Sequence, residues 1–401
     1  MNSPSIYLLI AAALFPAPQL QASASTFDAC ITELQGAALA EGVSPNTVKD
    51  VLGSAEYIER VVTSDRAQPE FNTTFTTYYG QRVTDHRIAL GRKLLVSHQP
   101  LLARLQRDTG VPPHYLLALW GLETNFGNYF GNLSIPSALA TLACDSRRTE
   151  FFANELLATL KIIDAGDLDA TELRGSWAGA IGHMQFMPTT YLAHAVDGDG
   201  DGRRDLFGSI DDALTSGGHY LRSLGWKKGF RWGREVQLPR GFDYAATGIE
   251  QRQSLSGWAE LGVMDAFGNR LPSLDLEAAI VLPTGATGPA FIVYDNFDII
   301  MQWNRSQSYA LAVGLLADRI NGAGQLSKPL PEVAAIQVSR AQTLKLQQTL
   351  NDLGYESGKP DGVVGPATTR AIRSFQASRG LLADGYPNQQ LFELLQTNAN
   401  Q

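Results

Sequence analysis

Apolar side chains recur at helical spacing over most of the chain. Apolar residues three and four positions apart predict helices, because those positions share one helix face. Helices are predicted at residues 99–108, 113–126, 150–165, 210–224 and 309–320. A mainly α-helical domain is therefore expected over residues 25–320.

The segment 231–298 departs from this pattern. Its short apolar runs at 278–282 and 290–294 are interrupted by Gly and Pro, which favours strands joined by turns. A small strand-rich insert is therefore expected within the helical domain.

A second domain is expected at the C-terminal end. Residues 321–335 have the Gly, Pro and polar content of a linker. Three short helices are then predicted at 341–354, 368–379 and 387–395, and they would form a compact three-helix unit within 336–401.

The first residues have the character of a signal peptide. An apolar run at 6–15 precedes the small residues Ala22, Ser23 and Ala24, which predicts cleavage after Ala24. The run is too short for a membrane anchor, and no later segment is apolar enough for one. We expect a signal peptide at 1–24 and a soluble protein exported to the periplasm.

Composition narrows the classes of partner. The formal net charge is -8, whereas nucleic-acid binding needs a positive field. Cys30 and Cys144 form an even pair, which is expected to bridge in an oxidising compartment, and two buried free thiols are the alternative. A monomer with no nucleic-acid partner and no transmembrane anchor is expected.

Glu123 is the leading candidate for catalysis. Leu116, Leu119 and Trp120 lie seven, four and three positions before it, so a helix would place its carboxyl group on an apolar face. A carboxyl group there must be paired, bind a metal, or stay protonated with a raised pKa. The last state is that of a general acid.

The segment 175–191 is dense in glycine, which lets the backbone approach a neighbouring element or a ligand closely. A ligand groove with Ser176 and Gln185 as polar contacts is one interpretation. Tight helix packing is the alternative, and composition does not separate the two.

An Asp-rich loop follows. Asp197, Asp199 and Asp201 occupy positions 1, 3 and 5 of a calcium-binding hand, and Arg203 would contribute its backbone carbonyl at position 7. Position 12 lacks the expected Glu, so Asp211 is expected to supply the last ligand in a longer loop. A solvated turn is the alternative, but carboxylates this close repel one another without a cation.

Asn304 and Tyr309 lie at the start of the helix predicted at 309–320. Amides hydrogen-bond sugar hydroxyls and aromatic faces pack on sugar rings, so the pair is typical of a carbohydrate site. An ordinary helix start with core aromatics fits equally well.

Two groups of motifs resemble known families. ALWGLETNFG, GSWAGAIGHMQFMPTTY and the Asp-rich loop, in this order and spacing, resemble the membrane-bound lytic murein transglycosylase B family. LQQTLNDLGY, AIRSFQ and the Asp361-Gly362 and Asp384-Gly385 pairs resemble the type 1 peptidoglycan-binding domain. The resemblance implies a lysozyme-like catalytic domain followed by a helical wall-binding domain.

The first resemblance implies a role for each candidate residue. It makes Glu123 the sole catalytic acid and base, with Ser176 and Gln185 orienting it and contacting sugar. Asn304 carries over, whereas Trp303 stands where the family has Tyr, so that hydroxyl is expected to be missing. The other implied positions are the substrate contacts Tyr309 and Tyr78 and the calcium ligands Asp197, Asp199, Asp201, Arg203 and Asp211.

The expected activity is lytic cleavage of the MurNAc-GlcNAc β-1,4 bond in peptidoglycan glycan strands, without water, to leave 1,6-anhydroMurNAc ends. Catalysis is expected to need no cofactor, and calcium is expected to be structural. Two alternatives stay open. A muramidase would use water and ordinarily a second carboxylate, and an inactive wall-binding protein would hold Glu123 as a core residue.

Overall fold

The computed structural model describes residues 19–67, 73–332 and 339–398. Most of the predicted signal peptide and the end of the predicted linker, 333–335, lie outside the described residues. Within the described part of the chain, no helix is long and apolar enough to cross a membrane.

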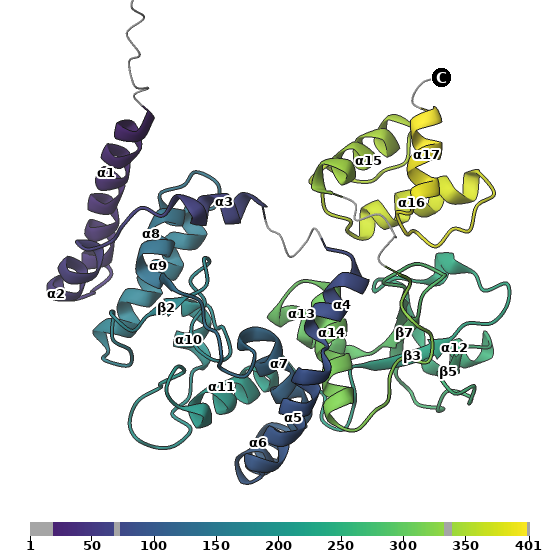
Figure 1. The fold of residues 1–401 in the computed structure, drawn as a ribbon, viewed down its shortest axis with the longest axis horizontal. Coiled ribbons are helices and arrows are strands. Elements are labelled where there is room, and N and C mark those ends of the chain that lie inside the picture. The colour runs from purple at the N-terminus through teal and green to yellow at the C-terminus, as the bar shows by residue number, and fades with distance from the viewer. Residues whose placement is uncertain (1–18, 68–72, 333–338, 399–401) are drawn as a thin grey trace, which may run out of the picture.

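Helix α7 (Pro113–Thr124) occupies the centre of the helical domain (Figure 1). Its residues from Tyr115 to Leu122 are all buried, so neighbours cover the helix on every side and its apolar surface extends beyond the face that carries Glu123. The surrounding helices are α5 (Asp85–Ser97), α6 (Gln99–Thr109), α11 (Ile210–Ser223) and α14 (Gln307–Ile320).

The predicted helices are found close to their expected ends. Those at 99–108, 150–165 and 210–224 appear as α6, α9 (Thr149–Asp164) and α11, each within one residue. Further helices of this domain are α2 (Pro45–Thr47), α3 (Glu59–Ala67), α4 (Phe75–Arg82), α8 (Ile135–Ala143), α10 (Pro188–His194), α12 (Leu255–Glu260) and α13 (Asp295–Trp303).

A disulfide bond ties the first helix to this domain. Cys30 of α1 (Gln19–Ala40) is bonded to Cys144 at the end of α8, with the two Cα atoms 5.9 Å apart, which confirms the predicted pairing. The bridge closes a loop of 114 residues. Loop-closure entropy gives such a bridge about 4 to 5 kcal/mol of stabilisation.

The predicted insert is an antiparallel sheet in the order β4-β6-β7-β3-β5. Alternate residues face opposite sides of the sheet. Val281 and Phe291 join the helical core, whereas Ile280 and Ile292 form a separate core with Trp258. Both faces are covered, which explains the continuous apolar runs of β6 and β7. The strands are β3 (Gly233–Gln237), β4 (Arg252–Ser254), β5 (Met264–Asp265), β6 (Glu277–Val281) and β7 (Ala290–Val293).

The C-terminal module contains α15 (Arg340–Asp352), α16 (Pro366–Ser378) and α17 (Gln389–Asn398). Its small core includes Leu350 and Phe375. The prediction of a three-helix unit is confirmed, with α16 beginning two residues earlier than expected.

Two buried glutamines organise this module by the same device. Gln347 of α15 accepts hydrogen bonds from the backbone N–H groups of Asp361 and Gly362, at 3.0 and 2.9 Å. Gln376 of α16 accepts one from Gly385 at 2.8 Å and donates to the carboxylate of Asp384 at 3.0 Å. Each Asp-Gly turn is therefore anchored to the buried face of a helix.

Candidate active site

The backbone leaves α7 abruptly after Glu123. Asn125 and Phe126 have left-handed φ angles of 51° and 59°, so the helix ends at Thr124 and not at residue 126 as predicted. Such conformations cost about 1–3 kcal/mol in residues other than glycine and persist where packing holds them. Phe126 packs edge-on against Trp120, with ring centroids 5.7 Å apart. Glu123 thus lies in the last turn of α7, and packing fixes the backbone that follows it.

Glu123 is half-buried, and two side chains hydrogen-bond to it. The Tyr309 hydroxyl donates to its Oε1 atom, and the Trp303 side chain supplies the second bond. Burial raises the pKa of the Glu123 carboxyl to about 7, because these bonds and the charge of Arg82 only partly offset the loss of solvent. A large share of the molecules therefore carries the neutral acid near pH 7.

Tyr309 donates from the first turn of α14. Ser306 caps this helix by accepting a bond from the Tyr309 backbone N–H at 3.3 Å. Burial and the Glu123 carboxylate raise the pKa of the Tyr309 hydroxyl far above its ordinary value, so it stays protonated as a donor. Tyr78 of α4 lies near enough to raise that pKa further, and the Arg82 guanidinium is 5.5 Å from the centre of the Tyr78 ring.

Trp303 ends α13 and forms an aromatic wall beside Glu123. Its ring centroid is 5.4 Å from that of Phe186 and 5.2 Å from that of Tyr220. The resemblance implied that a donor is lost where Trp303 replaces Tyr, but the structure retains one, because the Trp303 side chain hydrogen-bonds to Glu123. The adjacent Asn304 makes no side-chain hydrogen bond within the described residues, so its amide is available to a ligand.

The Gly-rich segment is a folded loop and not a packed helix. Gly179 and Gly182 have φ angles of 85° and 66°, and a Cβ on Gly182 would lie 2.3 Å from the Leu206 carbonyl oxygen. Gln185 is also left-handed, with φ 49°, and its amide donates to the Gly182 carbonyl at 3.0 Å. Close packing and a half-buried polar turn are therefore combined here.

Ser176 and Gln185 do not hydrogen-bond to Glu123 among the described residues. The Ser176 hydroxyl accepts a bond from the Ala180 backbone N–H at 3.2 Å. The amide oxygen of Gln185 has no partner in the described structure. Their roles as substrate contacts therefore remain predictions, and the implied role in orienting Glu123 is not what their hydrogen bonds do here.

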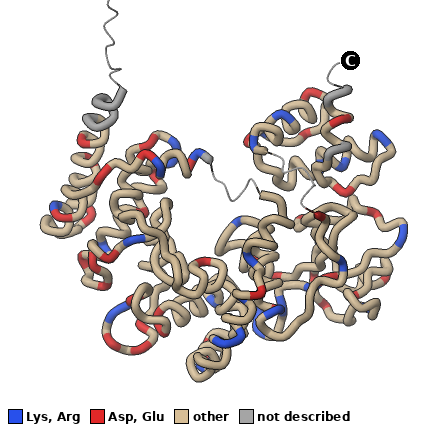
Figure 2. Tube along the Cα trace, in the orientation of Figure 1, with Lys and Arg blue, Asp and Glu red and all other residues tan. Residues whose placement is uncertain are grey.

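The Asp-rich loop joins α10 to α11, and Figure 2 shows both acidic and basic stretches along it. Carboxylate oxygens of Asp197, Asp199 and Asp212 lie within 4.8 Å of one another. Oxygen ligands converging in this way fit a hard cation such as calcium. Asp197 also accepts a bond from the Gly202 backbone N–H at 2.8 Å, which closes the loop around the group.

Asp201 and Asp211 lie outside this carboxylate group. The Asp211 carboxylate faces Arg104 at 3.4 Å, and Asp201 accepts a bond from the Arg203 backbone N–H at 2.8 Å. The structure adds Asp212 to the group, because α11 begins at Ile210 and turns the side chains of Asp211 and Asp212 to different sides. The ligand roles of Asp201, Arg203 and Asp211 stay predictions. The fully buried Asp212 accepts bonds from the N–H groups of Gly198 and Asp205, both at 2.7 Å.

A chain of contacts connects this loop to α7. The His183 backbone N–H donates to the Leu206 carbonyl at 2.9 Å, and the His183 ring accepts a bond from the Trp120 indole at 3.0 Å. Burial lowers the pKa of His183, which favours the neutral ring that can accept this bond. The loop therefore supports the helix that carries Glu123.

Among the described residues, no second carboxylate shifts the pKa of Glu123. The groups that shift its pKa are Tyr309, Arg82 and Trp303, and none is acidic. Asp145 is paired with Arg66 at 2.8 Å, and Asp164 accepts bonds from Ser44 and Thr47. Within the described residues, the site therefore offers one carboxyl group for proton transfer.

Sequence reasoning missed three residues of these sites, Arg82, Tyr220 and Asp212, and it also missed the donor role of Trp303. Arg82 lies four positions after Tyr78 on α4, so helical spacing from a suspected aromatic contact could have indicated it. The residues Tyr220 and Trp303 come from helices distant in sequence, and their contact depends on the tertiary fold.

Comparison with known proteins identifies the family. Residues 26–318 match the family described as transglycosylase SLT domain, and residues 339–395 match the family described as peptidoglycan binding domain. The chain belongs to the transglycosylase SLT family. It is thus a lytic transglycosylase with a C-terminal peptidoglycan-binding module, which confirms the predicted family, enzyme class and mainly helical fold.

Three relatives show the extent of the similarity. SltB3 from Pseudomonas aeruginosa, solved in complexes with NAG-NAM-pentapeptide and NAG-anhNAM-pentapeptide, is 40% identical with a TM-score of 0.89, over 92% of this chain and 99% of that one. Escherichia coli Slt35, solved in complex with calcium, is 27% identical with a TM-score of 0.63, over 73% and 92%. Membrane-bound lytic murein transglycosylase B of Escherichia coli K12 is 29% identical, over 70% of this chain and 79% of the relative.

Proposed function

We propose that this protein cleaves the MurNAc-GlcNAc β-1,4 bond of peptidoglycan and leaves 1,6-anhydroMurNAc ends. The observation that carries the proposal is a single carboxyl group, Glu123, with a pKa near 7, neutral donors around it and no acidic partner among the described residues. The SltB3 complex with NAG-anhNAM-pentapeptide supports this product, because the relative binds the anhydro form.

In the first step, protonated Glu123 donates its proton to the glycosidic oxygen as the bond to C1 of MurNAc breaks. Burial keeps the acid neutral before this step. The hydrogen bonds from Tyr309 and Trp303 then stabilise the carboxylate as its charge develops. Both donors remain protonated throughout, since Tyr309 has a strongly raised pKa and an indole does not titrate in this range.

In the second step, the Glu123 carboxylate accepts the proton of the MurNAc C6 hydroxyl, whose oxygen attacks C1 of the same sugar. The acid is thereby regenerated and no water is consumed. A hydrolase ordinarily uses a second carboxylate as nucleophile or to activate water. The lone carboxyl group therefore favours the intramolecular attack over the muramidase alternative.

The predicted substrate contacts fit around this centre. We propose that the Asn304 amide and the Gln185 amide oxygen hydrogen-bond sugar hydroxyls, because neither has another partner within the described structure. Tyr78 and the Trp303 ring would pack on pyranose faces, and Ser176 would contact sugar at the loop edge.

We propose that the Asp-rich loop holds a structural calcium ion. Asp197, Asp199 and Asp212 would bind it, and the all-oxygen donor set suits this metal. The crystal structure of Slt35 in complex with calcium supports the choice of ion. The ion would neutralise the carboxylates and hold the loop that supports α7.

We also propose that the protein works in the periplasm and binds peptidoglycan strands as a monomer. The disulfide bond supports export, because such bonds persist in oxidising compartments. The C-terminal module would raise the concentration of the enzyme on an insoluble substrate.

Glu123→Gln tests whether the acid is catalytic. The variant keeps the shape of the side chain and one oxygen that accepts hydrogen bonds, but its amide cannot transfer the proton. We expect sacculus lysis to fall by at least about a thousandfold, with unchanged folding and sacculus binding. Equal lysis by both proteins would make the protein a wall-binding scaffold whose Glu123 belongs to its core.

A further inference from the structure

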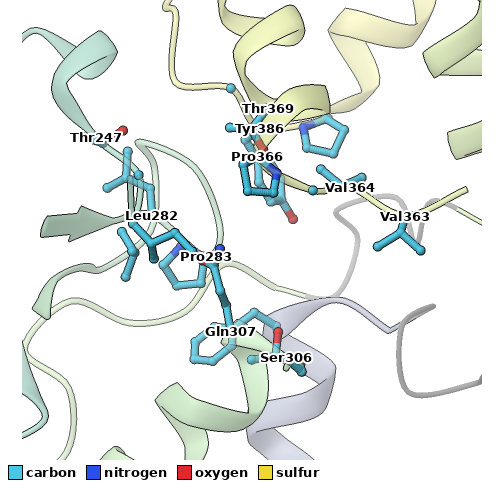
Figure 3. Close-up of a pocket in the computed structure, with 18 of the residues that line it drawn as sticks. Thr247, Leu282, Pro283, Ser306, Gln307, Val363, Val364, Pro366, Thr369 and Tyr386 are labelled. Atoms are coloured by element: carbon cyan, nitrogen blue, oxygen red, sulfur yellow. The ribbon is translucent and has the colours of Figure 1, made fainter. Parts of the chain in front are cut away.

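A cavity of about 500 Å³ lies where the C-terminal module meets the catalytic domain. One wall consists of the residues that precede and begin α14, and a second consists of loops of the insert. The third wall belongs to the module. Figure 3 shows side chains from all three walls turned toward a common space, among them Thr247, Leu282, Pro283, Ser306, Gln307, Pro366, Thr369 and Tyr386.

The module is fixed against the insert by specific bonds. Arg373 of α16 donates to the carbonyl and hydroxyl oxygens of Thr247, at 2.6 and 2.7 Å. The carboxylate of Asp384 accepts a bond from the Ala286 backbone N–H at 3.0 Å, and Arg370 pairs with Glu250. The walls of the cavity therefore hold a defined position relative to each other.

The cavity shares two segments with the active site. Residues 305–308 line the cavity, and they lie between Asn304 and Tyr309 of the catalytic centre. Phe75 begins α4 and lines the cavity, and Tyr78 of the same helix turn lies near Tyr309. The cavity walls are therefore continuous along the chain with the segments that carry the catalytic side chains.

Most charged side chains that line the cavity are paired, and one is not. Of its described charged residues, Arg370 and Arg373 are bonded to the insert, as is Asp384. Arg305 is exposed and has no hydrogen bond or ion pair within the described structure. The unsatisfied charge is therefore a guanidinium group, which matches a carboxylate in shape and charge.

We propose that this cavity binds the stem peptide of peptidoglycan and that Arg305 recognises one of its carboxylates. The glycan backbone carries no free carboxylate, since the lactyl group of each muramic acid is amide-linked to its peptide. The stem peptide does carry free carboxylates, and its amides suit the hydroxyl and amide side chains of Thr73, Gln307 and Ser308 on the walls. The volume lies in the range of pockets that enclose small ligands. The inference rests on the proposed function for its choice of substrate.

Binding of the isolated stem peptide tests this assignment without turnover. The peptide is released from sacculi by an amidase and titrated by calorimetry into full-length protein carrying Glu123→Gln. Adding Arg305→Ala is expected to weaken binding about five- to twentyfold, the usual effect of losing a charged hydrogen-bond partner. Arg270→Ala is the matched control, because Arg270 is exposed on the insert away from the cavity.

A second pair of variants tests the module wall. Val364 lines the cavity and is 39% exposed, whereas Leu382 is 56% exposed elsewhere on the same module. Val364→Trp is expected to weaken peptide binding by filling the space, and Leu382→Trp is expected to leave it unchanged. Equal peptide affinity in Arg305→Ala and its parent would overturn the proposal.

Turnover separates this inference from the proposed function. With Glu123 restored, Arg305→Ala should raise KM for peptide-bearing strands about five- to twentyfold at nearly constant kcat. An equal loss of affinity for strands stripped of peptide would show that the cavity binds sugar, which contradicts the assignment. An absence of anhydro ends would refute the proposed function and leave the binding result intact.

Discussion

At the scale of single residues, the site is explained by how Glu123 is surrounded. Its type and apolar sequence context predicted a raised pKa, and burial beside Tyr309 provides one. The donor role of Trp303 was not predictable, because a replaced Tyr indicates a lost hydroxyl while only the fold places an indole beside the carboxyl group. For the same reason Asp212 could not be predicted as a member of the carboxylate group, since its orientation depends on where α11 begins.

The raised pKa of Glu123 predicts the pH dependence of activity and stability. Activity should fall about tenfold per pH unit above about 7, as the acid loses its proton. The pKa of Glu123 in the folded state exceeds its ordinary value of 4.5. Its contribution to the free energy of unfolding is therefore fully present below about pH 4.5 and is lost as the pH rises to about 7. Above pH 8, Glu123→Gln should therefore be more stable than wild type by about 3 kcal/mol, since each unit of the pKa shift corresponds to about 1.4 kcal/mol.

Chemical denaturation at pH 5 and pH 8.5 measures this difference. The difference in the free energy of unfolding between variant and wild type should be smaller at pH 5. At that pH the carboxyl group is neutral in folded wild type and is partly neutral in the unfolded chain as well. An identical gap at both pH values would mean that Glu123 is not a buried acid.

The two donors to Glu123 should set the alkaline limit of activity. Both bonds lower the pKa of the carboxyl, with the larger effect from Tyr309, so removing either should raise that pKa. Tyr309→Phe should move the alkaline limb of the kcat profile to higher pH by more than Trp303→Phe does. Tyr355→Phe removes a hydroxyl in the C-terminal module and serves as control. An unshifted limb in both site variants would refute the proposed hydrogen bonding.

At the scale of elements, helix patterns predicted the main helices to within one or two residues. The predicted helix at 113–126 was too long, because the left-handed conformations of Asn125 and Phe126 depend on tertiary packing. The apolar runs predicted β6 and β7, but their places in the order β4-β6-β7-β3-β5 depend on pairings between distant segments. Periodicity carries no information on those pairings.

The Asp-rich loop should couple calcium to the stability of α7. Chelation should lower Tm by about 5 °C or more, as expected for loss of an ion bound well below its free concentration. Activity per folded molecule should change less, because Glu123 itself transfers the proton. Asp199→Asn and Asp212→Asn should abolish the calcium-dependent shift, and Asp211→Asn should retain it.

Differential scanning calorimetry with and without chelator measures the shift. Asp275→Asn is the matched control, because Asp275 is an exposed carboxylate in the insert outside the loop. A wild-type melting curve that does not respond to chelation would argue against a structural ion.

At the scale of the whole molecule, the motifs predicted two domains, but not the way they pack. Arg373, Asp384 and Arg370 dock the module on the insert through two backbone atoms, the Thr247 hydroxyl and the Glu250 carboxylate. Backbone partners have no signature in the sequence of the insert. The cavity between the domains was therefore not predictable, although the sequence predicted the domain to which each of its walls belongs.

Deleting the module should separate retention on the wall from chemistry. Truncation after Glu332 preserves Ser327 and Lys328, whose backbone N–H groups donate to Glu235 at 2.8 and 2.9 Å and hold the segment on the catalytic domain. Sacculus retention should fall at least tenfold, while cleavage of soluble fragments without peptide should change less than about twofold. Collapse of that cleavage as well would make the module part of the catalytic groove.

The central claim is that one carboxyl group, Glu123, serves as acid and then base without activating water. The most direct test is digestion of sacculi by the full-length protein in water labelled with the oxygen-18 isotope, followed by mass spectrometry of the glycan ends. We expect 1,6-anhydroMurNAc ends, which are one water lighter than reducing ends and contain no oxygen-18. A majority of reducing ends labelled with oxygen-18 would contradict the claim and identify a muramidase.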